Sequence, residues 1–125
     1  MKIGRIPFVV SGALLGCFGA GFLVAPSFVL GTYGVELDSS SARLVRMFGA
    51  AVLALALLSI HARDSDGDAQ RMVARTLLVF FLIKAIVSTE AVLGGMFNAL
   101  GWTILMIDAP LAAMWTTWLL RSRSA

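Results

Sequence analysis

Residues 72–93 read MVARTLLVFFLIKAIVSTEAVL, a run in which Arg75, Lys84 and Glu90 are the only charged side chains. A helix that crosses a bilayer needs about 20 predominantly apolar residues, and this run is long enough. Strands of a membrane barrel alternate in polarity at every second residue, which this run does not do. Because a helix satisfies its backbone hydrogen bonds within the segment, the run predicts a transmembrane helix.

Three more apolar runs, at about residues 6–30, 42–62 and 97–120, have the same character. The chain has 125 residues, of which 59% are hydrophobic and only 14% charged, and its mean hydropathy is +0.91. A soluble domain carries about 25% charged residues. The sequence therefore predicts an all-α protein, a bundle of four transmembrane helices that forms a single transmembrane domain over residues 1–125. Four spans leave no room for a separate catalytic or nucleic-acid-binding domain, so no nucleic-acid partner is expected.

Local signals near the ends of these runs refine the predicted helices. Pro26 is expected to kink the outer end of the first helix. The polar residues 38–41 can accept the free amide hydrogens at the start of the second helix. Ser65 and Asp68 are placed to form a capping box ahead of the third helix, and the glycines at 94–95 are expected to end it.

Basic residues predict how the chain is oriented, because Lys and Arg are retained on the cytoplasmic side. Arg43 and Arg46 fall near the opposite side. Trp102, Trp115 and Trp118 lie toward the ends of the last run, where interfacial aromatic residues anchor a helix at its depth. From the basic residues we expect a multi-pass protein of the plasma (inner) membrane with both termini in the cytoplasm. The basic residues that share the cytoplasmic side with the termini are Lys2, Arg5, Arg63, Arg71, Arg75, Arg121 and Arg123.

Four ionisable residues lie within or at the edges of the apolar spans: Arg46, Lys84, Glu90 and Asp108. A charge at the centre of a membrane helix costs about 2.5 to 3.5 kcal/mol on insertion scales, so these residues should face protein and one another. Their depths predict two buried charge pairs, Lys84 with Asp108 and Arg46 with Glu90. Such pairs can fix which helices are neighbours, relay protons or ions, or bind a polar lipid or a small ligand, and the sequence leaves these three roles open.

Small residues recur on helix faces and permit close approach of helices. The predicted packing residues are Gly12, Gly16 and Ala20 in the first helix and Ala50 and Ala54 in the second. The faces serve packing within the chain or the contact of a homo-oligomer.

A third stripe joins Lys84 to Ser88, Ala91 and Gly95 on one side of the third helix. Residues about four apart lie above one another on a helix, so their side chains share a face. This stripe is expected to line a narrow polar seam inside the bundle.

Several kinds of chemistry are disfavoured by what the chain contains. The chain has one cysteine, Cys17, and one histidine, His61, whereas a disulfide scaffold needs paired thiols and a bis-imidazole haem needs two histidines. Ser88 and Thr89 have no histidine at matching depth to act as a base. We therefore expect no catalytic residues, no metal site, no cofactor and no enzymatic activity.

The stretch Ser41–Ala51, SARLVRMFGAA, is followed by a run of alanine and leucine, and Asn98–Trp102, NALGW, opens the last span. In these features the chain resembles uncharacterised small bacterial four-helix integral membrane proteins of the DoxX-like kind. The resemblance implies a fold and a bacterial inner membrane, and it transfers no functional residue.

Two functions remain in competition. The first is an accessory or scaffold subunit that binds a larger membrane complex or lipid, with membrane lipids, a membrane-protein partner or further copies of the chain as partners. The alternative is a small oligomeric transporter or channel, coupled to ions or protons, that uses the buried charges at Lys84, Asp108, Arg46 and Glu90.

Overall fold

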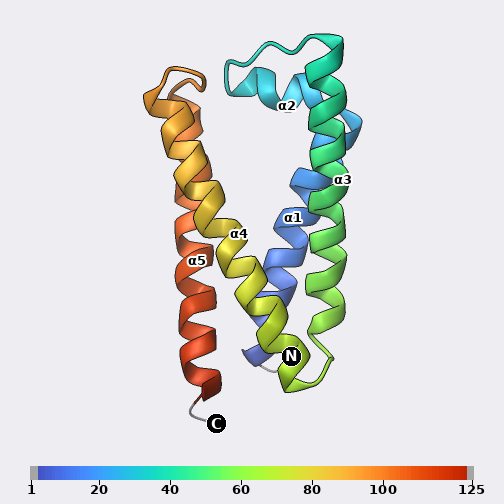
Figure 1. Ribbon diagram of the computed structural model, residues 1–125, viewed down its shortest axis with the longest axis vertical. Coiled ribbons are helices and arrows are strands. Elements are labelled where there is room, and N and C mark those ends of the chain that lie inside the picture. The colour runs from blue at the N-terminus through green and yellow to red at the C-terminus, as the bar shows by residue number, and fades with distance from the viewer. Residues whose placement is uncertain (1–2, 124–125) are drawn as a thin grey trace.

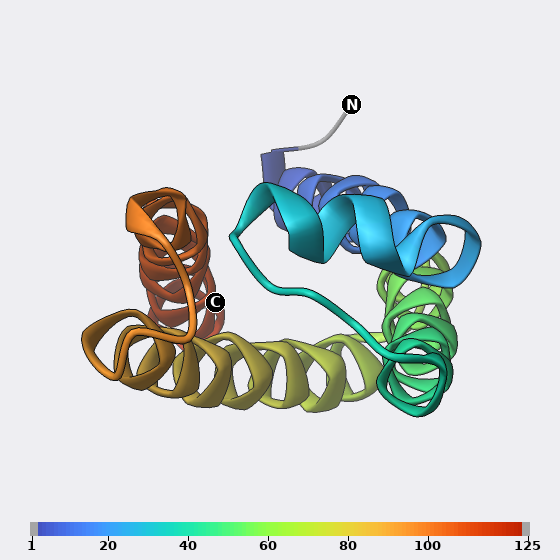
Figure 2. The same cartoon turned by 90° about the horizontal axis from the view of Figure 1, so that it is seen from above.

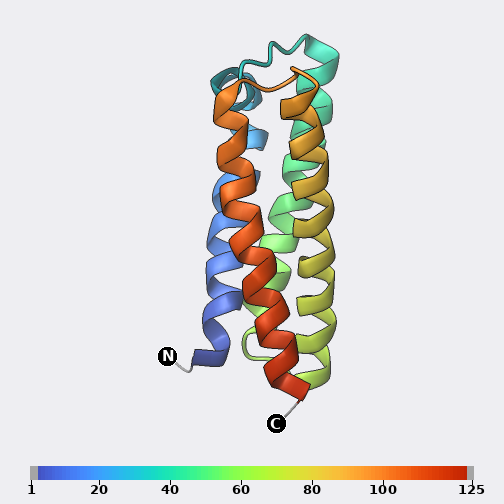
Figure 3. The same cartoon turned by 90° about the vertical axis from the view of Figure 1, so that its left-hand side faces the viewer.

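The computed structural model describes residues 3–123, which form a helical bundle without any strand in that range (Figure 1). The predicted all-α fold is confirmed, since 4 helices are long and apolar enough to cross a membrane. Successive long helices run in opposite directions, so the two ends of the described chain lie at the same end of the bundle (Figures 1 and 3). The elements are η1 (Ile3–Arg5), α1 (Ile6–Val24), α2 (Pro26–Thr32), α3 (Ser39–Ala62), α4 (Gly67–Leu93), η2 (Ala99–Gly101) and α5 (Trp102–Arg123).

The first apolar run is broken at Pro26, where the sequence predicted only a kink. Ala25 leaves the helical conformation, with φ −138° and ψ 60°, because a residue before proline is pushed away from the helical region. The chain then restarts as the short helix α2, which lies across the end of the bundle opposite the chain termini, here called the outer end (Figures 1 and 2). This change of direction places α2 above the space between the long helices.

Aspartates, rather than serines, cap the two longest helices. Asp38 accepts a hydrogen bond from the Ser41 amide at 2.7 Å, and α3 therefore begins at Ser39 instead of near residue 42. Asp66 accepts from the Ala69 amide at 2.8 Å and starts α4 at Gly67 instead of near residue 72. The helices extend past the apolar runs because hydropathy marks the hydrocarbon layer and not the end of a helix.

The predicted capping box of Ser65 and Asp68 does not form. The Ser65 hydroxyl donates to the His61 carbonyl at 3.2 Å, which places it at the end of α3. Asp68 instead pairs with Arg71 within the first turns of α4. The aspartate at position 66 takes the capping place because its backbone is extended there, with φ −65° and ψ 165°.

The long helices form two pairs, α1 with α3 and α4 with α5, and the pairs separate toward the outer end (Figure 1). They meet at the inner end, near the chain termini, around the fully buried side chains of Phe8, Leu77 and Trp115. The Trp115 indole N–H donates to the Ser11 hydroxyl at 2.9 Å and its ring meets Phe8 edge-on at 4.8 Å. Trp115 is thus a core residue and not the interfacial anchor expected from sequence, because Ser11 gives its polar edge a buried partner.

Helices α1 and α3 approach closely through glycines. A methyl group on Gly49 would lie 2.9 Å from the carbonyl oxygen of Gly19, and one on Gly12 would overlap the Ile60 side chain. Gly16 has more room, since its added methyl would be 3.9 Å from the Ala56 methyl.

Small residues do form the contact between α1 and α3, as predicted, but part of the predicted set lies on the wrong face of each helix. One residue turns a helix by about 100°, so a stripe displaced by one position faces away from its neighbour. Gly12 and Gly16 face α3, but the contact continues through Gly19 and Gly49. The three alanines expected at the contact are exposed instead: Ala20, Ala50 and Ala54.

Candidate ligand cavity

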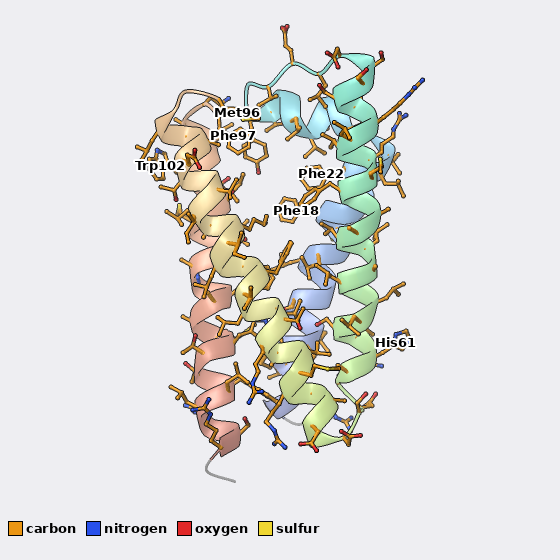
Figure 4. All side chains as sticks on the ribbon, viewed as in Figure 1. Phe18, Phe22, His61, Met96, Phe97 and Trp102 are labelled. Atoms are coloured by element: carbon orange, nitrogen blue, oxygen red, sulfur yellow. The ribbon has the colours of Figure 1, made fainter. Side chains whose placement is uncertain are left out.

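A cavity of about 430 Å³ occupies the space where the two helix pairs separate, and it is partly open to the surface of the bundle. Figure 4 shows Phe18 and Phe22 of α1 and Phe97, between α4 and α5, pointing toward this space. The lining is almost wholly apolar. Its residues are Phe18, Phe22, Leu30, Tyr33, Val45, Phe48, Phe80, Ile83, Lys84, Val87, Ser88, Phe97 and Ile104.

Aromatic rings form much of the wall. Phe22 packs against Phe18 with ring centroids 6.3 Å apart and against Phe48 at 5.6 Å. Phe80 lines the opposite side, from α4. The sequence does not identify these rings as cavity residues, because a phenylalanine that faces a cavity and one that faces lipid are indistinguishable in an apolar span.

A polar link crosses the outer end of the cavity. The Asn98 side-chain amide donates to the Thr32 carbonyl at 3.1 Å, and the Asn98 backbone amide donates to the Tyr33 carbonyl at 2.8 Å. The Tyr33 and Phe97 rings pack together with their centroids 5.7 Å apart. Gly34, with φ +82°, makes the turn that a residue with a side chain would find strained. These contacts tie the turn after α2 to the turn before α5 and close the outer end of the cavity.

Lys84 lies at the inner part of the cavity and is paired with Asp108. The Lys84 ammonium donates to Asp108 Oδ1 at 3.1 Å, with Lys84 23% exposed and Asp108 fully buried. The structure thus brings together the first of the two pairs that sequence depth suggested. The Lys84 Nζ also lies 5.5 Å from the centre of the Phe18 ring, a favourable place for a cation.

Hydrogen-bonding capacity is left over at this pair. A lysine ammonium has three N–H groups, and Asp108 is its sole hydrogen-bond partner within residues 3–123. Ser88 follows Lys84 by one turn of α4 and also lines the cavity, and its hydroxyl makes no hydrogen bond in the described chain. The second carboxylate oxygen of Asp108, Oδ2, is buried without a partner there. Lys84 and Ser88 therefore place hydrogen-bond donors next to each other on a mostly apolar wall.

Arg46 and Glu90 do not form the second predicted pair. Both side chains are exposed, and none of the ion pairs among the described residues involves either of them. Helices α3 and α4 diverge toward the outer end, where both residues lie (Figure 1). Similar depth in a bilayer was the basis of the prediction, and it does not place two side chains on facing sides of adjacent helices.

A second pocket, of about 480 Å³, lies near the chain termini and is lined by Gly4, Pro7, Met114, Thr117, Trp118, Arg121 and Ser122. Residues 3–123 contain no cluster of three His, Cys, Asp or Glu side chains that could hold a metal ion. His61 points away from the bundle (Figure 4), and Cys17 is exposed on α1. The polar stripe of α4 contributes Lys84 and Ser88 to the cavity, whereas Ala91 and Gly95 do not line it.

The chain belongs to the family described as a domain of unknown function, DUF8292, which matches residues 8–122. No curated protein and no solved structure matches it. The family description carries no activity, and the resemblance to DoxX-like proteins stays a prediction that none of these comparisons supports. What the chain does must therefore be argued from its own residues.

Proposed function

Since membership of the family assigns no activity, we propose from the cavity that this is a small accessory membrane protein that binds a lipid-like molecule between its two helix pairs, without catalysis of its own. The observation that carries the proposal is a cavity of about 430 Å³ with aromatic and aliphatic walls, lined among the described residues by one charged side chain, Lys84, whose partner Asp108 is fully buried. Binding sites for small molecules have this composition, in which apolar walls supply affinity and a few polar groups orient the ligand.

The size of the cavity limits the ligand. Small-molecule sites usually measure about 300 to 1,000 Å³, so this cavity falls toward the lower end. At about 30 Å³ for each water-sized group, 430 Å³ holds on the order of a dozen non-hydrogen atoms. That volume accepts a small head and the first part of one chain, and the remainder of the chain extends between the helix pairs into lipid. A complete phospholipid with two chains is too large.

The outer surface of the bundle supports the accessory role. Large apolar side chains are exposed on the long helices, among them Leu44 and Met47 on α3 and Ile86 on α4, each at least 66% exposed. In a bilayer such faces contact acyl chains, the helices of a larger complex or a second copy of the chain. Copurification from native membranes in mild detergent tests for a partner, and recovery of the chain alone as a monomer counts against the accessory role.

Ligand binding is tested with two matched substitutions on α4. Ile83 lines the cavity and Ile86 does not, although both are exposed isoleucines of the same helix. The protein in nanodiscs is titrated with a fluorescent single-chain acyl probe, with empty nanodiscs as background. Ile83→Trp fills part of the cavity and is expected to weaken saturable binding about tenfold, while Ile86→Trp leaves it unchanged. Absence of saturable binding, or equal loss in both variants, contradicts the proposal.

A transporter is the second candidate, and the unpaired Asp108 Oδ2 favours it. A buried carboxylate oxygen without a partner, beside a lysine, is the kind of group that takes up and releases a proton in membrane carriers. Purified protein in liposomes that carry a pH-sensitive dye tests this role. Proton movement that Asp108→Asn abolishes without unfolding favours transport over the accessory role.

The orientation of the chain follows from its basic residues. The described arginines Arg5, Arg63 and Arg121 belong to the end of the bundle where the pairs meet, and Arg5 and Arg63 both contact Asp64 there. Lys2, which the sequence placed with them, lies outside the described residues. The positive-inside rule supports our proposal that this end faces the cytoplasm, in a protein of the plasma (inner) membrane.

Cysteine labelling tests the orientation. In a Cys17→Ala background, Ser39→Cys should react with a membrane-impermeant thiol reagent on intact cells, and Arg123→Cys should react only after the cells are opened. The reverse pattern contradicts the proposed topology.

A further inference from the structure

We infer that the head of the ligand is uncharged and carries a carbonyl or ester oxygen, which accepts hydrogen bonds from Lys84 and Ser88. The inference rests on the proposed binding function and names the class of molecule: a single-chain amphiphile with a neutral, hydrogen-bond-accepting head. The juxtaposition that carries it is a charge-neutral ion pair and a free hydroxyl at the inner part of an apolar cavity.

The net charge of the Lys84–Asp108 pair disfavours a ligand with an anionic head. Lys84 and Asp108 sum to zero, and Asp108 is fully buried, so its charge stays beside the ammonium. Lys84 is the only charged residue that lines the cavity among the described residues. An anion bound there leaves the buried site with one net negative charge, and a cation is opposed by the ammonium that faces it. A neutral head adds no net charge to the buried site and is not repelled by the ammonium.

The hydrogen-bond donors of Lys84 and Ser88 favour a head group that accepts hydrogen bonds. Lys84 and Ser88 stand four residues apart on α4, a spacing that brings side chains together on one helix face. Asp108 takes one N–H of the ammonium, and the Ser88 hydroxyl has no partner in the described chain. A carbonyl oxygen has two lone pairs and can accept from both groups at once. A plain hydrocarbon would leave the Ser88 hydroxyl and two N–H groups of Lys84 without an acceptor.

The surroundings keep the ammonium in place for this role. Its Nζ lies 5.5 Å from the Phe18 ring centre, and Phe18 itself lines the cavity. Lys84 is held from one side by the carboxylate of α5 and from another by the ring of α1. The head group therefore meets a donor whose position is already fixed, and the chain beyond it meets the rings of Phe22 and Phe48.

A competition experiment with the full-length protein in nanodiscs tests the inference. The reporter is methyl cis-parinarate, an uncharged ester with a small head whose conjugated chain fluoresces in apolar surroundings, with empty nanodiscs as background. The competitors are methyl myristate and tetradecyl sulfonate, which have chains of the same length and differ in the charge of the head. The methyl ester is expected to displace the reporter at a concentration at least tenfold lower than the sulfonate.

Variants assign the preference to the named donors. Ser88→Ala, which removes one hydroxyl, should weaken the ester several-fold and leave the sulfonate unchanged. The double variant Lys84→Met/Asp108→Leu, which replaces the pair by apolar groups, should remove the preference for the ester. If the double variant does not fold, Ser88→Ala and the competitor ratio in the unaltered protein still decide.

The outcomes separate this inference from the function on which it rests. Saturable reporter binding with equal displacement by both competitors, or stronger displacement by the sulfonate, overturns the neutral-head inference and leaves lipid binding standing. No saturable binding of reporter or competitor overturns the proposed function itself. An ester preference that Ser88→Ala leaves intact refutes the role given to Ser88.

Discussion

Substitution of Gly49 by alanine tests whether close approach of α1 and α3 holds this helix pair together. The added methyl would lie 2.9 Å from both the Gly19 carbonyl oxygen and the Leu23 amide nitrogen, whereas ordinary contacts begin at 3.4 Å. The shortfall is 3.4 − 2.9, or about 0.5 Å, and both neighbours are backbone atoms that cannot rotate away. The helices must therefore move apart, and overpacking of this kind costs about 1 to 3 kcal/mol.

Gly16→Ala is the matched control, because its methyl would meet only the Ala56 methyl at 3.9 Å, an ordinary contact. Both variants gain about 1 kcal/mol of helix propensity over glycine, so the difference between them isolates the cost of separating the helices. Unfolding is followed by circular dichroism as the mole fraction of SDS rises in mixed micelles. Gly49→Ala should be about 1 to 3 kcal/mol less stable than Gly16→Ala. Equal free energies of unfolding for the two variants would refute the reasoning.

Three further predictions concern the charged and polar contacts. Lys84→Met alone leaves Asp108 buried without its cation and should lower the free energy of unfolding by about 3 to 5 kcal/mol, while Lys84→Met/Asp108→Leu recovers most of that loss in the same SDS titration. Hydrogen bonds from the Ser41 backbone amide hold the pKa of Asp38 below its usual value of 3.8, so its stabilising effect is present above that pH and lost as the pH falls through the lower folded value. The stability difference between the unaltered protein and Asp38→Ala should accordingly shrink between pH 5 and pH 3, and a difference independent of pH contradicts the cap. Asn98→Ala removes the side-chain link to Thr32 and should speed dissociation of a bound acyl probe in stopped-flow measurements; an unchanged rate means that the link does not close the cavity.

The fold was predictable because the bilayer imposes it. Apolar runs of spanning length admit one regular structure, so the number of long helices and their alternating directions follow from hydropathy alone. Helix ends follow other rules. Asp66 extends α4 into water beyond its apolar run, and Ala25 breaks the first run because of Pro26, neither of which hydropathy records.

The candidate site was predictable only in part, because depth and lateral position are different quantities. Lys84 and Asp108 were matched by depth, and they meet because α4 and α5 are consecutive helices that pack along their length. Arg46 and Glu90 were matched in the same way, but they lie on helices that diverge. The phase of the glycine contact, with Gly19 in place of Ala20, depends on the exact rotation of each helix, which small-residue spacing leaves open.

The ion pair of Lys84 and Asp108 lies within one helix pair. Lys84 and Asp108 belong to α4 and α5, so their bond stabilises one helix pair and does not join the two pairs. Polar bonds that do cross between pairs lie at the ends, among them Trp115 to Ser11 at the inner end and Asn98 to Thr32 at the outer end. A ligand that accepts a hydrogen bond from Lys84 therefore breaks neither of these polar bonds between the pairs. Because the inner bond is buried and the outer one is exposed, the contacts at the outer end should open before those of the core around Trp115.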